Sequence, residues 1–136
     1  MQNNIQSFYL SLGEESCFFL QILNIAEKEL GYNLDPVTTA LICKSKGYIY
    51  LNLNDFKDKK NFLVYGHKEI LNLITGKEWE YTKEAAPYKP KKNEYVINEY
   101  ANGSYTHFDS DFHSLQNSQT IKNGKIVSKR IFRIKK

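Results

Sequence analysis

Apolar residues between about residues 15 and 30 recur at the spacing of a mostly buried α-helix. They are Cys17, Phe18, Leu20, Ile22, Leu23, Ile25, Ala26 and Leu30. Glu14 and Glu15 stand in the expected first turn, where acidic side chains complement the helix dipole, and Gly31 is suited to cap the C-terminal end. The pattern predicts a helix from about Glu15 to Leu30 that has Cys17 near its N-terminus.

A second helix is predicted to begin at Asp35-Pro36, because aspartate is a good N-cap and proline fits the first helical position. We expect it to end near Gly47. Its inner face is predicted to carry Val37, Ala40 and Leu41, and the same face could extend to Cys43. A third, shorter helix is expected from about His67 to Thr75, with Gly76 closing it and His67 doing no more than beginning it.

Strand patterns dominate the second half of the chain, although a short alternating run already occurs over residues 48–51. Trp79 and Tyr81 alternate with charged residues, and a strand is predicted from about Glu94 to Tyr100. Two hairpin turns are predicted where asparagine precedes glycine. They are Asn102-Gly103, followed by a returning strand with Tyr105, Thr106, His107 and Phe108, and Asn123-Gly124, which joins residues 119–122 to a strand over Lys125–Ile134.

Helices therefore come first and strands second, which predicts an α+β fold with N-terminal helices packed on a C-terminal antiparallel sheet. The chain has 136 residues, of which 41% are hydrophobic and 25% charged, as expected of one globular domain over residues 1–136. The aromatic fraction of 14% agrees with a substantial strand content.

The net charge of +4 is mild, and the basic residues are almost all lysine, which disfavours a dedicated nucleic-acid binder. A basic run near the C-terminus could still contact an anionic partner; it comprises Lys129, Arg130, Arg133, Lys135 and Lys136. No apolar run approaches the roughly 18 residues that cross a bilayer, and residues 1–6 do not resemble a signal peptide. Two cysteines, Cys17 and Cys43, form neither a disulfide framework nor a zinc signature, so a reduced, cytoplasmic protein is expected.

Cys17 and His107 are the candidate catalytic pair. A thiol becomes a good nucleophile as the thiolate, which a helix N-terminus and a nearby imidazolium both stabilise. Cys17 begins the first predicted helix, and His107 lies on a late strand. Each residue also has a simpler interpretation, since a cysteine on an apolar helix is often a small core residue and a strand histidine often faces solvent.

Short motifs stand at both ends of the chain. The first is Gly13-Glu14-Glu15-Ser16-Cys17-Phe18-Phe19-Leu20. The second comprises Thr106-His107-Phe108, the segment from Asn117 to Lys125 and Ser128-Lys129-Arg130-Ile131-Phe132. These motifs resemble peptidase-C39-like proteins, which are papain-like cysteine peptidases, and especially relatives encoded on spirochaete plasmids and prophages. The resemblance implies a papain-like fold with a Cys17–His107 dyad acting on a peptide or protein substrate.

The sequence departs from that family at two places. The glutamine that usually supplies the oxyanion hole stands about six positions before the cysteine, where this chain has Ser11; Gln6 is further away. The loop after the histidine is compressed, and His113 aligns with the usual aspartate. Asp109, Asp111 and Asn117 remain as candidates to orient His107, with Asp111 slightly preferred.

The series His107, Asp109, Asp111, His113 could also be interpreted as a metal cluster. Alternate residues of an extended strand are roughly 7 Å apart, which suits zinc poorly unless a turn gathers them. The sequence therefore favours no metal and no cofactor.

The favoured function is a cysteine peptidase or amidase. The alternative is an inactive peptidase-like binding protein, of phage or plasmid origin, that acts on a host protein through the aromatic strands between Trp79 and Tyr105. Nucleic-acid binding by the basic C-terminal hairpin ranks last.

Overall fold

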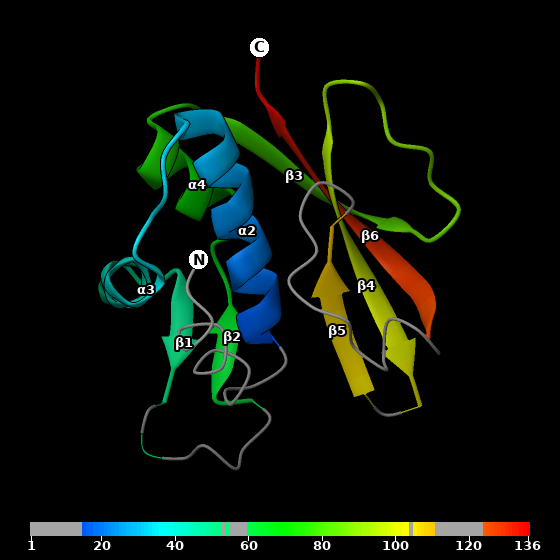
Figure 1. Ribbon diagram of the computed structural model, residues 1–136, viewed down its shortest axis with the longest axis horizontal. Helices are drawn as coiled ribbons and strands as arrows, with labels where there is room; N and C mark the ends of the chain where they lie inside the picture. Colours follow the sequence, from blue (N-terminus) through cyan, green and yellow to red (C-terminus); the bar gives the residue numbers. More distant parts are fainter. Residues whose placement is uncertain (1–14, 53, 55–59, 104, 111–123) are drawn as a thin grey trace.

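The computed structural model describes residues 15–52, 54, 60–103, 105–110 and 124–136. Within these ranges it contains α2 (Glu15–Leu30), α3 (Pro36–Ser45), β1 (Ile49–Leu51), β2 (Phe62–Val64), α4 (His67–Thr75), β3 (Trp79–Ala85), β4 (Tyr95–Asn102), β5 (Tyr105–Asp109) and β6 (Lys125–Ile134). The strands form two antiparallel sheets, a pair β1-β2 and a four-stranded sheet in the order β3-β6-β4-β5 (Figure 1). The predicted α+β class with an antiparallel sheet is confirmed.

Helix α2 runs through the middle of the molecule, with β2 and α4 on one side and the edge strand β5 on the other (Figure 1). Every residue from Ser16 to Ala26 is buried. The near-continuous apolar pattern of this helix is explained by its position, because neighbours cover its whole circumference.

Aromatic rings join α2 to the four-stranded sheet. Phe18 stacks on Phe108 of β5 with ring centroids 4.6 Å apart, and its ring centroid lies 6.4 Å from that of Phe132 on β6. On the other side of the helix, Phe19 contacts Phe62 of β2 at 5.4 Å. The Phe18 contacts pack α2 against the four-stranded sheet, and the Phe19 contact packs it against β2.

Strand β4 lies between β6 and β5, and its pairing with β5 ends in a tight hairpin. Asn102 pairs with Tyr105, and Gly103 has a φ of 63°, a left-handed conformation that glycine adopts at little cost. The predicted hairpin is therefore confirmed, although Asn102 is the last residue of β4, so the turn begins one position later, at Gly103. Of the second predicted turn, Asn123 and residues 119–122 lie outside the described residues.

Helix α3 is rotated relative to the sequence prediction. Asp35 caps it by accepting a hydrogen bond from the Thr38 backbone N–H, as the sequence predicts. The buried residues are Pro36, Ala40 and Cys43, whereas Val37 is 38% and Leu41 49% exposed. The prediction that Val37 and Leu41 face inward was wrong, because α3 packs mainly against β1 and buries one narrow stripe of residues.

Candidate active site

Cys17 is the third residue of α2 and is 6% exposed. The first turn of this helix is tied to β2, because the Val64 backbone N–H donates to Glu15 Oε1 at 2.9 Å. The partial positive charge of a helix N-terminus favours an anionic group there, and a thiolate is one. The position predicted for Cys17 at the start of a buried helix is confirmed.

His107 lies on the strand predicted for it, the edge strand β5, and is also 6% exposed, so the simpler interpretation of His107 as a solvent-facing strand residue is wrong. Burial lowers the pKa of His107 below its ordinary value, and the Asp109 carboxylate opposes this shift. Its Nε2 atom is buried and has no hydrogen-bond partner within the described part of the chain. A neutral imidazole of this kind is able to accept a proton at neutral pH.

A buried polar link joins α2 to the end of β5. Gln21 Nε2 donates to Asp109 Oδ1 at 3.0 Å, and the hydroxyl of Ser110 donates to Gln21 Oε1 at 2.6 Å. Gln21 is fully buried, and Asp109 and Ser110 are 7% and 5% exposed. Because buried polar groups are costly when unpaired, this link holds the helix and the strand in one relative position.

The same link indicates where Cys17 lies relative to His107. Helix α2 and strand β5 run in the same direction, since Phe18 contacts Phe108 and the later Gln21 contacts the later Asp109 (Figure 1). Cys17 precedes Gln21 by one turn, about 6 Å, and lies on the same helix face. His107 precedes Asp109 by two residues, about 6–7 Å, and lies on the same strand face. Cys17 and His107 therefore each precede the Gln21–Asp109 hydrogen bond by a similar length along α2 and β5.

Of the three residues predicted to orient His107, only Asp109 lies within the described residues, two positions along the strand on the same face. Asp111 and Asn117 lie outside them, as do His113 and both oxyanion candidates, Ser11 and Gln6.

Three buried polar residues near the site were missed by the sequence prediction: Gln21, Ser110 and Asn98. Gln21 could have been identified from the sequence, because Cys17, Gln21 and Asn24 recur at the spacing of one helix face within a mostly apolar helix. Asn24 Nδ2 indeed lies 3.5 Å from Gln21 Oε1. Asn98 of β4 had no such signal.

A polar hollow of about 330 Å³ lies beside the start of α2, lined by residues that include Glu15, His67, Glu99, Thr106 and Arg130. Glu15 is two residues from Cys17, and Thr106 precedes His107 on β5 but points to the opposite face of the sheet. The guanidinium of Arg130 lies 5.2 Å from the ring centroid of Phe18 and pairs with Glu99 Oε1 at 3.0 Å. The hollow is therefore on the Phe108 side of β5, whereas the His107 side chain is on the other side of that strand.

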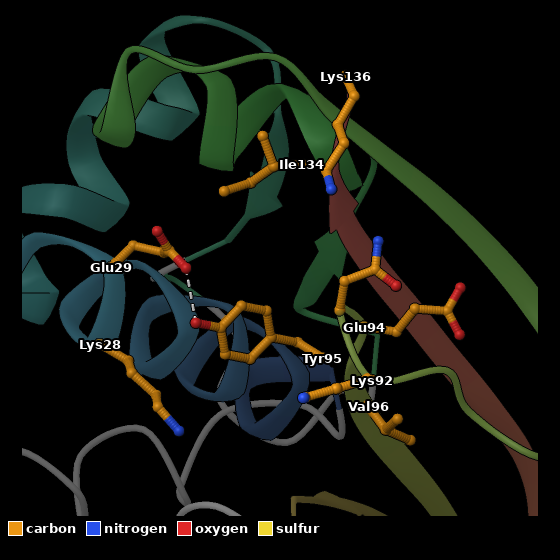
Figure 2. A pocket seen from close by; sticks show the side chains of 9 residues that line it. Lys28, Glu29, Lys92, Glu94, Tyr95, Val96, Ile134 and Lys136 are labelled. Atoms are coloured by element: carbon orange, nitrogen blue, oxygen red, sulfur yellow. Dashed lines mark hydrogen bonds between the residues drawn. The ribbon is translucent and has the colours of Figure 1, made fainter.

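A second hollow, of about 580 Å³, lies at the far end of α2, where Lys28, Lys92 and Lys136 stand around the ring of Tyr95 (Figure 2). The Tyr95 hydroxyl donates to Glu29 Oε1 at 2.6 Å, and burial together with Glu29 raises the pKa of Tyr95 to about 12. Lys28 is eleven residues beyond Cys17, about 16 Å along the helix, so this hollow is separate from the candidate pair.

The C-terminal basic run is largely engaged within the protein. Arg130 pairs with Glu99, and Arg133 contacts Glu80 at 3.0 Å and Glu94 at 2.7 Å. Lys129 donates to the backbone carbonyl of Tyr88 at 2.8 Å.

Trp79, expected among the contact residues of a binding surface, is 2% exposed, and its indole N–H donates to Thr75. The prediction that Trp79 belongs to an exposed contact surface is therefore wrong. Larger exposed apolar side chains occur instead on α3 and in the region of β1 and β2; they include Leu41, Ile42, Tyr50 and Tyr65.

No protein-family model, no curated protein and no solved structure matches this chain. None of the helices in the described ranges has the length and apolar character needed to cross a membrane. Among the same residues, no three His, Cys, Asp or Glu side chains gather into a group that could hold a metal ion.

Acid is expected to destabilise the protein through its buried histidines. Burial lowers the pKa of both His107 and His67 below the ordinary value of 6.5. The unfolded chain therefore binds protons at a higher pH than the folded chain, so stability is present above pH 6.5 and is lost as the pH falls toward the folded-state values. Urea unfolding midpoints measured on either side of pH 6.5 should decrease on the acid side.

The variant His107→Gln should make this pH dependence shallower, and His67→Gln serves as the matched comparison on the other buried ring. Burial by itself would raise the pKa of Glu94, but its hydrogen bonds and the charge of Arg133 outweigh that effect and lower it. Carboxylates of this kind therefore titrate at a lower pH than the two histidines. A stability that rises on acidification through pH 6.5 would contradict the neutral, buried state of the two rings.

Proposed function

We propose that this protein is a cysteine hydrolase that cleaves an amide bond with Cys17 as nucleophile and His107 as general base. The observation that carries the proposal is the Gln21–Asp109 hydrogen bond, because it ties α2, which carries Cys17, to β5, which carries His107. A helix N-terminus for the thiol and a neutral, buried imidazole are the conditions that such a pair requires.

In the proposed reaction, Cys17 Sγ attacks the carbonyl carbon of the substrate while His107 takes the thiol proton. The backbone N–H of Cys17, at the start of the helix, would stabilise the oxyanion. The C–N bond then breaks, and His107 gives its proton to the departing amine. Water attacks the thioester, His107 accepts a proton from it, and the carboxylic acid and the thiol are released.

The resemblance of the Cys17 and His107 segments to peptidase-C39-like proteins supports a papain-like arrangement as part of this proposal. A helix that begins with the thiol and packs beside the histidine strand is the arrangement that the resemblance implies. The substrate class follows as a peptide, a protein or a smaller amide.

Iodoacetamide labelling tests the proposal. Burial raises the pKa of the Cys43 thiol to about 11, so only roughly 10⁻⁴ of it is thiolate at pH 7. Cys43 is also fully buried. We expect Cys17 to react more than about tenfold faster than Cys43 near neutral pH, with mass spectrometry identifying the modified residue.

Two variants complete the labelling experiment. Cys43→Ala should leave the labelling rate of the protein unchanged, and His107→Gln should slow labelling of Cys17 because the thiol loses its base. Equal, slow labelling of both cysteines in the folded protein would contradict the proposal.

A binding protein without catalytic activity is the second candidate, and the exposed apolar residues Leu41 and Ile42 on α3 favour it. Apolar side chains at a surface are suited to contact another protein, such as a host target. Its test is the variant Cys17→Ala. This candidate is correct if the biological effect of the chain survives that substitution, and the hydrolase is correct if the effect is lost while the fold is kept.

A further inference from the structure

The hollow at the far end of α2 is the larger of the two described above, with a volume of about 580 Å³. Its lining comes from three segments that are far apart in the sequence: the last turn of α2, the residues that lead into β4, and the end of β6 with the residues beyond it (Figure 2). Sites for small molecules have volumes of about 300–1,000 Å³ and usually combine an apolar surface with a few charged groups. The hollow has the size of such a site, and its lining determines which ligand fits.

The apolar part of the lining includes an aromatic ring that is held in place. Tyr95 and Ile134 both line the hollow and pack against the hydrophobic core. The Tyr95 hydroxyl donates to Glu29 Oε1, and the centroid of the Tyr95 ring lies 6.0 Å from that of Trp79. Because these contacts already restrict the ring, a ligand that stacks on it loses little free energy in ordering the site.

The charged part of the lining is mainly cationic. One lysine comes from each of the three segments: Lys28, Lys92 and Lys136 (Figure 2). Lys28 Nζ lies 5.8 Å from the centroid of the Tyr95 ring, so a cation and the aromatic surface are neighbours. The C-terminal end of a helix carries a partial negative charge of about half an elementary charge, which is small beside three ammonium groups.

The two carboxylates of the lining do not reverse this sign, because each has a cation of its own. Glu29 Oε2 lies 3.4 Å from Lys77 Nζ, and Glu94 Oε2 lies 2.7 Å from the Arg133 guanidinium. The Glu94 side chain is also fully buried. The hollow therefore favours an anion, and the aromatic ring beside it favours a flat apolar group.

Lysine side chains indicate which anion fits. The planar fork of arginine matches a planar carboxylate, whereas the ammonium of lysine is a point charge on a flexible stem that is able to approach a phosphate from any side. Lysines on three separate segments are suited to surround the oxygens of one phosphate group. We propose that the hollow binds a small molecule in which a flat aromatic ring is joined to a phosphate, with the ring against Tyr95 and the phosphate among Lys28, Lys92 and Lys136.

Two kinds of molecule carry this chemistry. A mononucleotide joins a base to a phosphate through a ribose, and nucleic-acid bases stack readily on aromatic side chains. An aryl phosphate joins the two groups directly. Either ligand would bind whether the protein is a hydrolase or a binding protein, because Cys17 is about 16 Å away along α2.

The test is a titration of the ¹⁵N-labelled protein followed by proton–nitrogen NMR, with adenosine monophosphate, phenyl phosphate, adenosine and inorganic phosphate as probes. At least one of the two probes that join a ring to a phosphate should shift the amide signals of residues 92–96, with a dissociation constant below about 5 mM. Adenosine and inorganic phosphate each offer half of that chemistry and should bind at least about tenfold more weakly. Tighter binding of adenosine monophosphate would identify a nucleotide site, and tighter binding of phenyl phosphate a site for an aryl phosphate.

Two pairs of exposed lysines provide matched variants. Lys28→Ala combined with Lys92→Ala removes two cations of the hollow and should weaken binding of the tighter probe at least about tenfold. Lys44→Ala combined with Lys46→Ala lowers the net charge equally but removes lysines at the end of α3. Because salt screens exposed charges at a distance, this second pair should change the dissociation constant by less than about twofold.

The aromatic ring has its own pair of variants. Tyr95→Leu removes the flat surface and should weaken binding of the tighter probe about tenfold. Tyr95→Phe keeps the ring and loses only the hydroxyl that donates to Glu29, so it should bind within about threefold of the wild-type protein.

The proposal is overturned if neither adenosine monophosphate nor phenyl phosphate binds with a dissociation constant below about 5 mM, or if the shifted signals lie away from the hollow. It is equally overturned if inorganic phosphate binds as tightly as the better of these two probes, since the ring then contributes nothing. Equal losses for the Lys28–Lys92 and Lys44–Lys46 variants would also reject it, because binding would then depend on net charge rather than on the hollow.

Discussion

Replacing Phe18 with alanine is expected to lower the free energy of unfolding by about 3–5 kcal/mol. The Phe18 ring is 1% exposed and stacks on Phe108, and its centroid is 5.5 Å from that of His67. It therefore contacts α4 and the four-stranded sheet at once. Alanine would leave a cavity where three elements meet, and these elements cannot all move inward to fill it.

Urea unfolding of Phe18→Ala followed by circular dichroism measures this effect. Leu73→Ala is the matched control, because Leu73 is also an apolar helix residue but is 41% exposed, and its loss should cost less than about 0.5 kcal/mol. A loss below about 1 kcal/mol for Phe18→Ala would show that α2 is not held against β5 as described.

The variant Arg130→Met is expected to cost about 3 kcal/mol, since it leaves the Glu99 carboxylate without its cation. The Arg130 and Glu99 side chains are only 12% and 18% exposed. Arg130 also donates to the hydroxyl oxygens of Tyr81 and Ser128 at 3.0 and 3.1 Å. The guanidinium is therefore the centre of a polar network in which each partner would lose a hydrogen bond.

The double variant Arg130→Met with Glu99→Gln should recover part of that loss, because it removes the uncompensated charge. Lys77→Met is the control, since the Lys77–Glu29 ion pair is 3.4 Å long and the lysine is 52% exposed. Exposed pairs contribute less than about 1 kcal/mol. Equal effects of the Arg130 and Lys77 substitutions would show that the Arg130 network is solvated.

The sequence predicts best those elements whose ends carry local signals. Helices α2 and α4 have the predicted bounds, because acidic residues or a terminal glycine mark where they begin or end. Strand β2 was not foreseen, since it has only three residues and exists by pairing with β1. The inner face of α3 was mispredicted because the apolar pattern does not say which side a neighbour covers.

For the candidate site, the sequence places Cys17 and His107 on the correct elements but does not show that Gln21 and Asp109 join those elements. Gln21 and Asp109 are 88 positions apart, and neither stands in a recognisable motif. Asn98 is one polar residue among several on an alternating strand, and its burial follows only from the assembled sheet.

The Gln21–Asp109 hydrogen bond also has a consequence for the order of events during synthesis. It closes a loop of 88 residues, and contacts between such distant positions form late because the entropy of loop closure opposes them. Helix α2 leaves the ribosome long before β5 does. Helix α2 and strand β5 therefore come together only after β5 has been made, so a nascent or truncated chain that ends before β5 carries Cys17 without the strand that bears His107.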